Sequence, residues 1–155
     1  MMKDELKIVI DELIALIETG THSIKHNESR LNGLLDELAV GIRVKSTTFG
    51  NIEYPDPPER NQKELRDLVC SRFPDYGYYN IPESILWKIG ESEVIVGDAI
   101  DDIVDITNDL SKIAWRWEHN DPDDAIWHFY RDFVSHWGLH LRSLQLYVHL
   151  SRYGE

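Results

Sequence analysis

A chain of 155 residues is long enough for one domain with a buried core, and its 42% hydrophobic and 28% charged residues are typical of folded proteins. The formal net charge of −12 disfavours nucleic acid and anionic membranes as partners, because proteins that bind them present basic surfaces. We therefore expect a single helical domain over residues 1–155, and the sign of the charge suits a basic protein surface or bound cations.

The single cysteine, Cys70, excludes an intrachain disulfide and any cysteine-based zinc site. Acidic residues interrupt the apolar N-terminal segment MMKDELKIVIDELIALIETG, which is unlike a signal peptide or a membrane span. A cytoplasmic location is the simplest expectation from these two features.

Apolar residues at helical spacing predict an all-α fold, a bundle of five or six helices with proline- and tyrosine-rich connecting loops. The first two helices are expected over about residues 6–20 and 24–44, as an antiparallel hairpin. Two long helices are expected to close the bundle, one from residue 83 or 92 to 118, broken near Gly90, and one over about 121–152.

The middle of the chain has a different composition, since five of the six prolines lie between Tyr54 and Pro82. It predicts a loop, then a short helix over about residues 62–73, then a second loop that contains Tyr76, Tyr78 and Tyr79. Loops this rich in aromatic residues pack either onto the body of the protein or onto a partner. The three tyrosines are therefore candidates for partner binding, with packing onto the bundle as the alternative.

Five aspartates fall in the segment GDAIDDIVDITNDL, residues 97–110, with no lysine or arginine among them. On a helix they form one acidic strip between two apolar surfaces, and this strip consists of Asp98, Asp101, Asp102, Asp105 and Asp109. Like charges at these spacings cost a few tenths of a kcal/mol per pair, so the acidic strip needs a counter-charge. Arginines at 116, 131 and 142, a divalent cation and a basic partner are the alternatives, and internal neutralisation is favoured.

Histidines occur twice in pairs four residues apart, His22 with His26 and His136 with His140. On a helix this spacing points two imidazoles in one direction, as in metal sites of helical bundles. The second pair adjoins the apolar stripe of the last helix, where a histidine bonded to a carboxylate is the structural alternative. If that helix packs against the acidic strip, the sequence predicts a divalent-metal site with ligands from His136, His140, Asp98, Asp102 and Asp105.

Phosphate loops, dinucleotide-binding turns and nucleophile elbows are absent from the sequence. Three hypotheses of function remain. The leading one is a non-catalytic protein-interaction or regulatory module that uses the acidic strip and the tyrosines. The second is a divalent-metal-dependent hydrolase or transferase, and the third is an acidic mimic of nucleic acid that inhibits a basic enzyme. The oligomeric state stays open, a homodimer included.

The segments FPDYGYYNI, IGESEVIVGDAIDDIVDI, WRWE and DDAIWHF, followed by HWGLHLRSLQLYVH, together resemble the bacterial family known as domain of unknown function 5063. The resemblance covers most of the chain and is clearest over residues 73–150. It implies a small, mostly helical bacterial protein and supplies no catalytic residues.

The run HWGLHLRSLQLY is also similar to the last helix of DinB-like four-helix bundles, which hold a divalent metal through three histidines. In that pattern an arginine directly follows the second histidine, whereas here it stands one place later, as Arg142. The third histidine has no clear counterpart, and His22 or His26 is the available choice.

Overall fold

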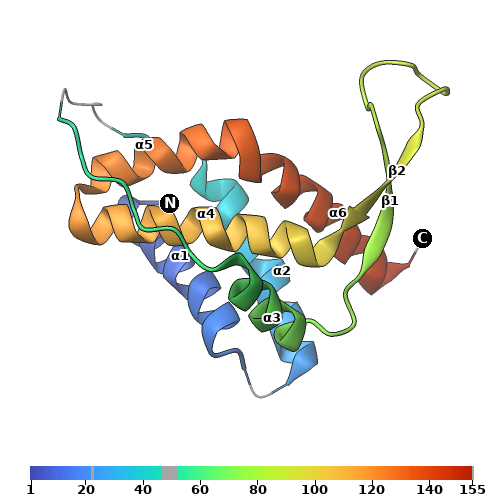
Figure 1. The fold of residues 1–155 in the computed structure, drawn as a ribbon, viewed down its shortest axis with the longest axis horizontal. Coiled ribbons are helices and arrows are strands. Elements are labelled where there is room, and N and C mark those ends of the chain that lie inside the picture. The colour runs from blue at the N-terminus through green and yellow to red at the C-terminus, as the bar shows by residue number, and fades with distance from the viewer. Residues whose placement is uncertain (22, 47–51, 155) are drawn as a thin grey trace.

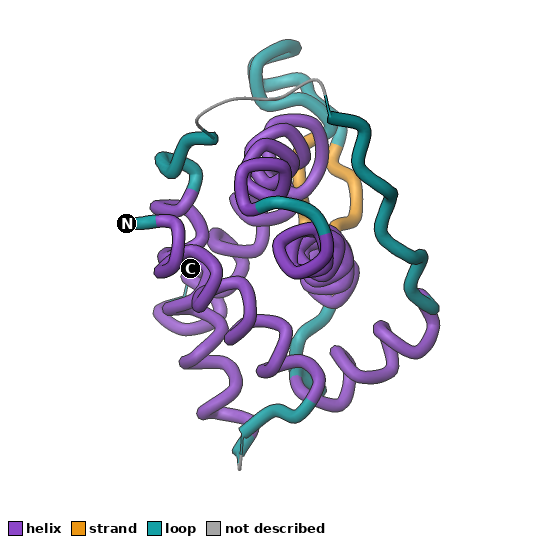
Figure 2. The backbone as a smooth tube through the Cα atoms, turned by 90° about the vertical axis from the view of Figure 1, so that its left-hand side faces the viewer, coloured by secondary structure: helices purple, strands orange, loops and turns teal. Residues whose placement is uncertain are grey.

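The protein is a bundle of α-helices with one small two-stranded sheet, described here from a computed structural model that covers residues 1–21, 23–46 and 52–154 (Figure 1). Within these ranges the elements in chain order are α1 (Lys3–Glu18), α2 (Ile24–Gly41), α3 (Gln62–Arg72), β1 (Tyr78–Pro82), β2 (Val94–Asp98), α4 (Ala99–His119), α5 (Pro122–Asp132), a π-helical turn (Phe133–Trp137) and α6 (Gly138–Tyr153). Figure 2 shows that helices make up nearly all of the body and that the strands lie together at its far side. The predicted all-α bundle is confirmed.

The first two helices form the expected antiparallel hairpin, and their apolar stripes face each other and the rest of the core. The buried residues of α2 include Asn27, whose side-chain oxygen accepts a hydrogen bond from the Thr21 N–H at 2.7 Å. Its amide nitrogen donates to the carbonyl of Arg72 at 3.3 Å, at the end of α3. One buried asparagine thus joins the turn between α1 and α2 to the third helix.

The long helix α4 is the central element, since it packs against α1, α3, α5 and α6. Its apolar stripe is fully buried at positions three and four residues apart, namely Ile103, Ile106, Leu110 and Ile113. The edges of α4 beside this stripe therefore lie close to neighbouring helices. None of the helices over the described ranges combines the length and the apolar character that a membrane crossing needs.

The helix predicted over residues 121–152 is interrupted by the π-helical turn between α5 and α6. There the Gly138 N–H donates to the carbonyl of Phe133, five residues earlier. A Cβ atom at residue 138 would lie 2.3 Å from that carbonyl oxygen, so the turn requires glycine. Apolar periodicity did not predict the interruption, because Phe129 before the turn and Trp137 at its end still pack against each other in the core.

The segment predicted to open the long helix forms a β-hairpin instead. Strand β2 begins with Val94, Ile95 and Val96, and consecutive β-branched residues have stiff side chains that favour strands over helices. The connection between the strands contains Gly90, whose φ of 77° suits glycine. The second predicted loop is accordingly wrong in part, since Tyr78 and Tyr79 lie in β1.

Candidate metal centre

The first two carboxylates of the acidic strip are neutralised from α3. Asp98 lies in the N-cap position of α4, where its Oδ1 accepts from the Ile100 N–H at 2.9 Å. Its Oδ2 accepts from the Arg66 guanidinium at 2.9 Å, and the same guanidinium pairs with Asp101. The counter-charge that the strip requires is therefore supplied, at this end, by an arginine of the same chain.

The three arginines that the sequence favoured for this role have other partners: Arg116 pairs with Asp56 and Asp124, Arg131 with Asp132, and Arg142 bonds Gln145. Internal neutralisation is thus present, but through a different residue. The reason is tertiary, because the arginine that does it lies on the short helix α3, more than thirty residues before the aspartates it binds.

Asp102 is buried and uses both of its carboxylate oxygens. Its Oδ1 lies 2.7 Å from the Nδ1 of His140, and its Oδ2 accepts from the Tyr79 hydroxyl at 2.5 Å. Burial raises the pKa of Tyr79, and the hydrogen bond to Asp102 raises it further, so this hydroxyl keeps its proton. Asp102 therefore joins the β-hairpin, α4 and α6, and it fixes the plane of the His140 ring.

A second carboxylate and imidazole repeat this arrangement about two helical turns further along α4. The Oδ2 of Asp109 lies 2.7 Å from the Nδ1 of His136. Burial raises the pKa of Asp109, and the bond to His136 opposes that rise. Each of the two neighbouring histidines is thus held through Nδ1 by an aspartate of the acidic strip.

Asp105 lies between these two pairs, close to both histidines. Asp105, His136 and His140 each offer one ligand atom, and these atoms all lie within 4.8 Å of one another. The Nε2 of His140 is 3.4 Å from the Oδ2 of Asp105, which is the spacing of roughly 3.4 Å between two ligands of a tetrahedral metal site. Two imidazoles and one carboxylate are a common ligand set for a divalent transition metal.

The hydrogen bonds behind the two rings suit this role. An Nδ1–H that donates to a carboxylate selects the tautomer whose Nε2 lone pair is free to bind a metal. Asp102 and Asp109 provide such acceptors for His140 and His136. The hydrogen bond from Asp102 raises the pKa of His140, and the nearby Asp105 adds to this. Metal ions and protons would therefore compete for this imidazole.

His136 belongs to the π-helical turn, while His140 lies in the first turn of α6. Their ring centres are 5.0 Å apart, with the ring planes at 69°. Turns of this type occur often at functional sites, where they change the direction in which a side chain projects from a helix. The centre is open to solvent, since the side chains of His136, Asp105 and His140 are 48%, 35% and 27% exposed.

Of the five ligands predicted from the sequence, the fold brings together Asp105, His136 and His140. Asp102 stands behind His140, and Asp98 is occupied at the helix cap and by an arginine. The third ligand of the cluster is thus a carboxylate rather than the histidine of the DinB-like pattern, and His22 lies outside the described residues. Sequence reasoning missed Tyr79 as a partner of Asp102.

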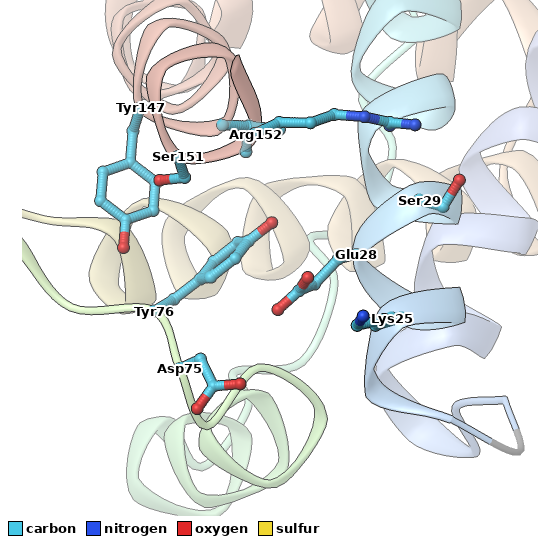
Figure 3. A pocket seen from close by; sticks show the side chains of 9 residues that line it. Lys25, Glu28, Ser29, Asp75, Tyr76, Tyr147, Ser151 and Arg152 are labelled. Carbon is cyan, nitrogen blue, oxygen red and sulfur yellow. The ribbon is translucent and has the colours of Figure 1, made fainter. Parts of the chain in front are cut away.

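The three predicted partner-binding tyrosines have different surroundings. Tyr78 is 75% exposed, whereas Tyr76 stacks on Phe73 with ring centres 5.3 Å apart and meets Tyr147 of α6 at the same distance. Tyr76 lines a pocket of about 620 Å³ together with Lys25, Glu28 and Arg152. Figure 3 shows its ring between α2, α6 and the segment before β1. Packing onto the body, the alternative weighed from the sequence, holds for Tyr76 and Tyr79.

Comparison with known proteins identifies the fold alone. No protein-family model matches the chain, and no curated protein does. A solved structure with a similar fold is that of protein BF1032 from Bacteroides fragilis, with a TM-score of 0.75 and 15% sequence identity. The match covers 98% of this chain and 92% of that one, so the similarity of fold extends over nearly the whole of both chains.

Proposed function

We propose that this protein binds one divalent transition-metal ion through Asp105, His136 and His140, and that the ion serves a hydrolase or transferase reaction. The observation that carries the proposal is the meeting of three ligand atoms within 4.8 Å, two of them on imidazoles that aspartates hold from behind. A structural histidine needs one such partner, whereas a metal ligand needs the partner and a free second nitrogen that points at other ligands.

The ligand types favour zinc, manganese, iron or nickel over magnesium and calcium. Imidazole nitrogen suits the transition metals, while magnesium and calcium prefer sites built of oxygen atoms. The three side chains need to close by roughly 1 Å to reach bonding distances of about 2.1 Å, and their partial exposure leaves room for that rotation.

Three protein ligands leave coordination positions for water and substrate, which is the arrangement of catalytic rather than structural metal sites. An ion held by these three residues would lower the pKa of a bound water, to about 7 for zinc, and would so supply a nucleophile. A pocket of about 390 Å³ adjoins the centre, lined by His136 and Asp109 together with Lys112 and Arg131. Of the three proposed ligands its lining includes His136 but not Asp105 or His140, so the pocket lies beside the centre on the Asp109 side of the His136 ring.

Metal binding to chelator-stripped protein, measured by calorimetry and thermal melting with zinc, manganese, magnesium and calcium, tests the proposal. A ligand in hundredfold excess over its dissociation constant adds about 2.7 kcal/mol of stability, a clear shift in the melting midpoint. His140→Ala and Asp105→Asn should abolish that shift. His149→Ala is the matched control, because His149 is exposed on the same helix and outside the cluster.

Equal binding by His140→Ala and His149→Ala would place the ion elsewhere and refute the proposal. If the predicted pattern is found, hydrolysis of phosphate and carboxylate esters by the metal-loaded protein is the next assay, with Asp105→Asn as the inactive control.

A protein-interaction role, the leading hypothesis from the sequence, draws its support from the exposed apolar hairpin rather than from the acidic strip. Four of the five aspartates in the strip bond Arg66, Tyr79 or a histidine of the same chain at 2.9 Å or less, and the fifth, Asp105, faces His140 at 3.4 Å. These internal bonds occupy carboxylate oxygens that a basic partner would otherwise bind, although Arg66 is the one cationic side chain among these partners. Membership in domain of unknown function 5063 and a cytoplasmic location remain proposals that fit a small helical protein.

A further inference from the structure

The β-hairpin exposes an unusual amount of apolar surface. Figure 1 shows this arm, defined as residues 78–97, projecting from the helical body. Seven of its large apolar side chains are at least two-thirds exposed: Tyr78, Ile85, Leu86, Trp87, Ile89, Val94 and Val96. At on the order of 100 Å² each they present roughly 700 Å² of apolar surface in total.

The two edges of the arm differ. An apolar groove of about 690 Å³ lies between α6 and the arm, and its lining takes residues from β1 and the adjoining loop but none from β2. Strand β1 therefore faces the body, and it also contains Pro82, which has no N–H to offer a further strand. Strand β2 forms the outer edge, and no proline, lysine or arginine interrupts it.

The register of the hairpin determines which backbone groups that edge offers. Glu83 donates to the carbonyl of Glu93, and Ala99 to that of Gly77, so the odd-numbered residues of this part of β2 bond β1. The N–H and C=O groups of Val94 and Val96 then point away from β1. Among the described residues these groups have no recorded hydrogen-bond partner.

We infer that the outer edge of β2 pairs with the same edge of a second copy of this chain. Two such edges are self-complementary about a two-fold axis at Ile95: Val94 of one copy bonds Val96 of the other, and the reverse bonds follow by symmetry. The hairpins then form one four-stranded antiparallel sheet, with a cluster of four valines on one face.

Area and charge favour a second copy as the occupant. The apolar surface of the arm is close to the ~800 Å² that each partner contributes to a standard interface. The arm carries three of the 28 acidic residues and one lysine, a net charge of −2, so most of the chain's net charge of −12 lies on the helical body. Electrostatic repulsion between the two negatively charged bodies opposes association. Because salt screens this repulsion, it should strengthen the dimer, whereas it would weaken pairing with a basic partner.

Light scattering after gel filtration of the full chain tests the inference, with a dimer expected at micromolar concentrations. Val96→Lys and Val94→Pro should give monomers, the second because proline removes only an N–H that faces away from β1. Ile8→Lys is the matched control, since Ile8 is an exposed apolar residue of α1 and should leave the dimer intact. Circular dichroism establishes that each variant is folded.

Cysteine cross-linking tests the register, in a Cys70→Ser background because Cys70 is exposed. Across the two-fold axis the Cα atoms of residue 95 would lie about 4.5 Å apart, within disulfide range, while those of residue 94 would lie roughly 8 Å apart. Ile95→Cys should therefore give a covalent dimer on mild oxidation and Val94→Cys should not.

Three results would overturn the inference: a monomer at all concentrations, a dimer unaffected by Val96→Lys, or equal cross-linking at residues 94 and 95. A protein that stays monomeric at all concentrations would favour a strand of a different protein as the partner of the β2 edge. All three are independent of metal binding, because the arm contributes no residue to the proposed ligand set.

Discussion

Asp102 holds His140 from behind: its Oδ1 lies 2.7 Å from the Nδ1 of His140, while the Nε2 of the same ring faces Asp105 at 3.4 Å. One imidazole thus connects a buried carboxylate to a half-exposed one. This relationship orients a nitrogen lone pair toward solvent at a fixed place between α4 and α6, and the first prediction rests on it.

Asp102→Asn should weaken metal binding by about 10- to 100-fold, the usual effect of losing a carboxylate behind a ligating histidine. Asparagine can accept from Tyr79 only through its oxygen, which turns its amide group toward His140 and stabilises the tautomer with the proton on Nε2. Calorimetry at pH 7.5 measures the change. Asp101→Asn is the control, because its carboxylate is exposed and pairs with Arg66, and affinity equal in the two variants would contradict the prediction.

Gly138→Ala should destabilise the protein by about 1–3 kcal/mol in urea unfolding, since a Cβ would lie 2.3 Å from the Phe133 carbonyl oxygen. Relief of that clash requires the π-helical turn to change, which displaces His136, so metal affinity should fall as well. Gly33→Ala in α2 is the matched control. The nearest atom to its Cβ would be 3.8 Å away, and helix propensity should then raise stability by about 0.5–1 kcal/mol.

Arg66→Met should lower the free energy of unfolding by about 1 kcal/mol, because it leaves Asp98 and Asp101 without their shared counter-charge. The effect should shrink at high salt, which screens the remaining repulsion. Adding Asp98→Asn should restore part of the loss, since asparagine caps a helix and carries no charge. No recovery in the double variant would contradict the assignment of the loss to the unpaired charge of Asp98.

The surroundings of His128 predict that the free energy of unfolding decreases at acidic pH. Its side chain lies 3.4 Å from Asp124, its Nδ1 is buried without a recorded partner, and burial, helped by the charge of Arg116, lowers its pKa below 6.5. The folded state therefore prefers the neutral ring, and its contribution is lost as pH falls from about 6.5 through the lowered pKa.

Urea unfolding of His128→Gln between pH 5 and 7.5 checks this sign. The variant should lose less stability on acidification than the wild type, and His149→Gln, at an exposed position, should follow the wild type. A steeper acid limb in His128→Gln would contradict the assignment, because it would mean that protonated His128 stabilises the fold.

Local periodicity was sufficient for the helical body. The apolar residues that α1, α2 and α4 bury can be recognised in the sequence, because each helix buries one face. Residues on one face of a helix recur every three or four positions. Segments without such a one-sided pattern were assigned less well. The β-hairpin was missed because an apolar run such as Val94 to Val96 suits a strand or a buried helix equally.

The proposed metal centre could be predicted in part from the same helical periodicity. The spacing of His136 and His140, and that of Asp98, Asp102, Asp105 and Asp109, are properties of single helices and were read from the sequence. Which aspartate meets which histidine depends on how α4 and α6 are aligned along each other, and no local pattern specifies that offset. The π-helical turn adds a further shift that only the packing of Gly138 against Phe133 decides.

The helical class, the acidic strip and the residue types from which a metal centre could be built were predictable, because they follow from composition and from periods within one element. The tertiary structure alone decided that Arg66 neutralises one end of the strip, that Asp105 is the carboxylate between the two imidazoles, and that β2 is an open edge. Each of these depends on contacts between residues far apart in the chain, and such contacts are set by the packing of whole elements rather than by neighbours in sequence.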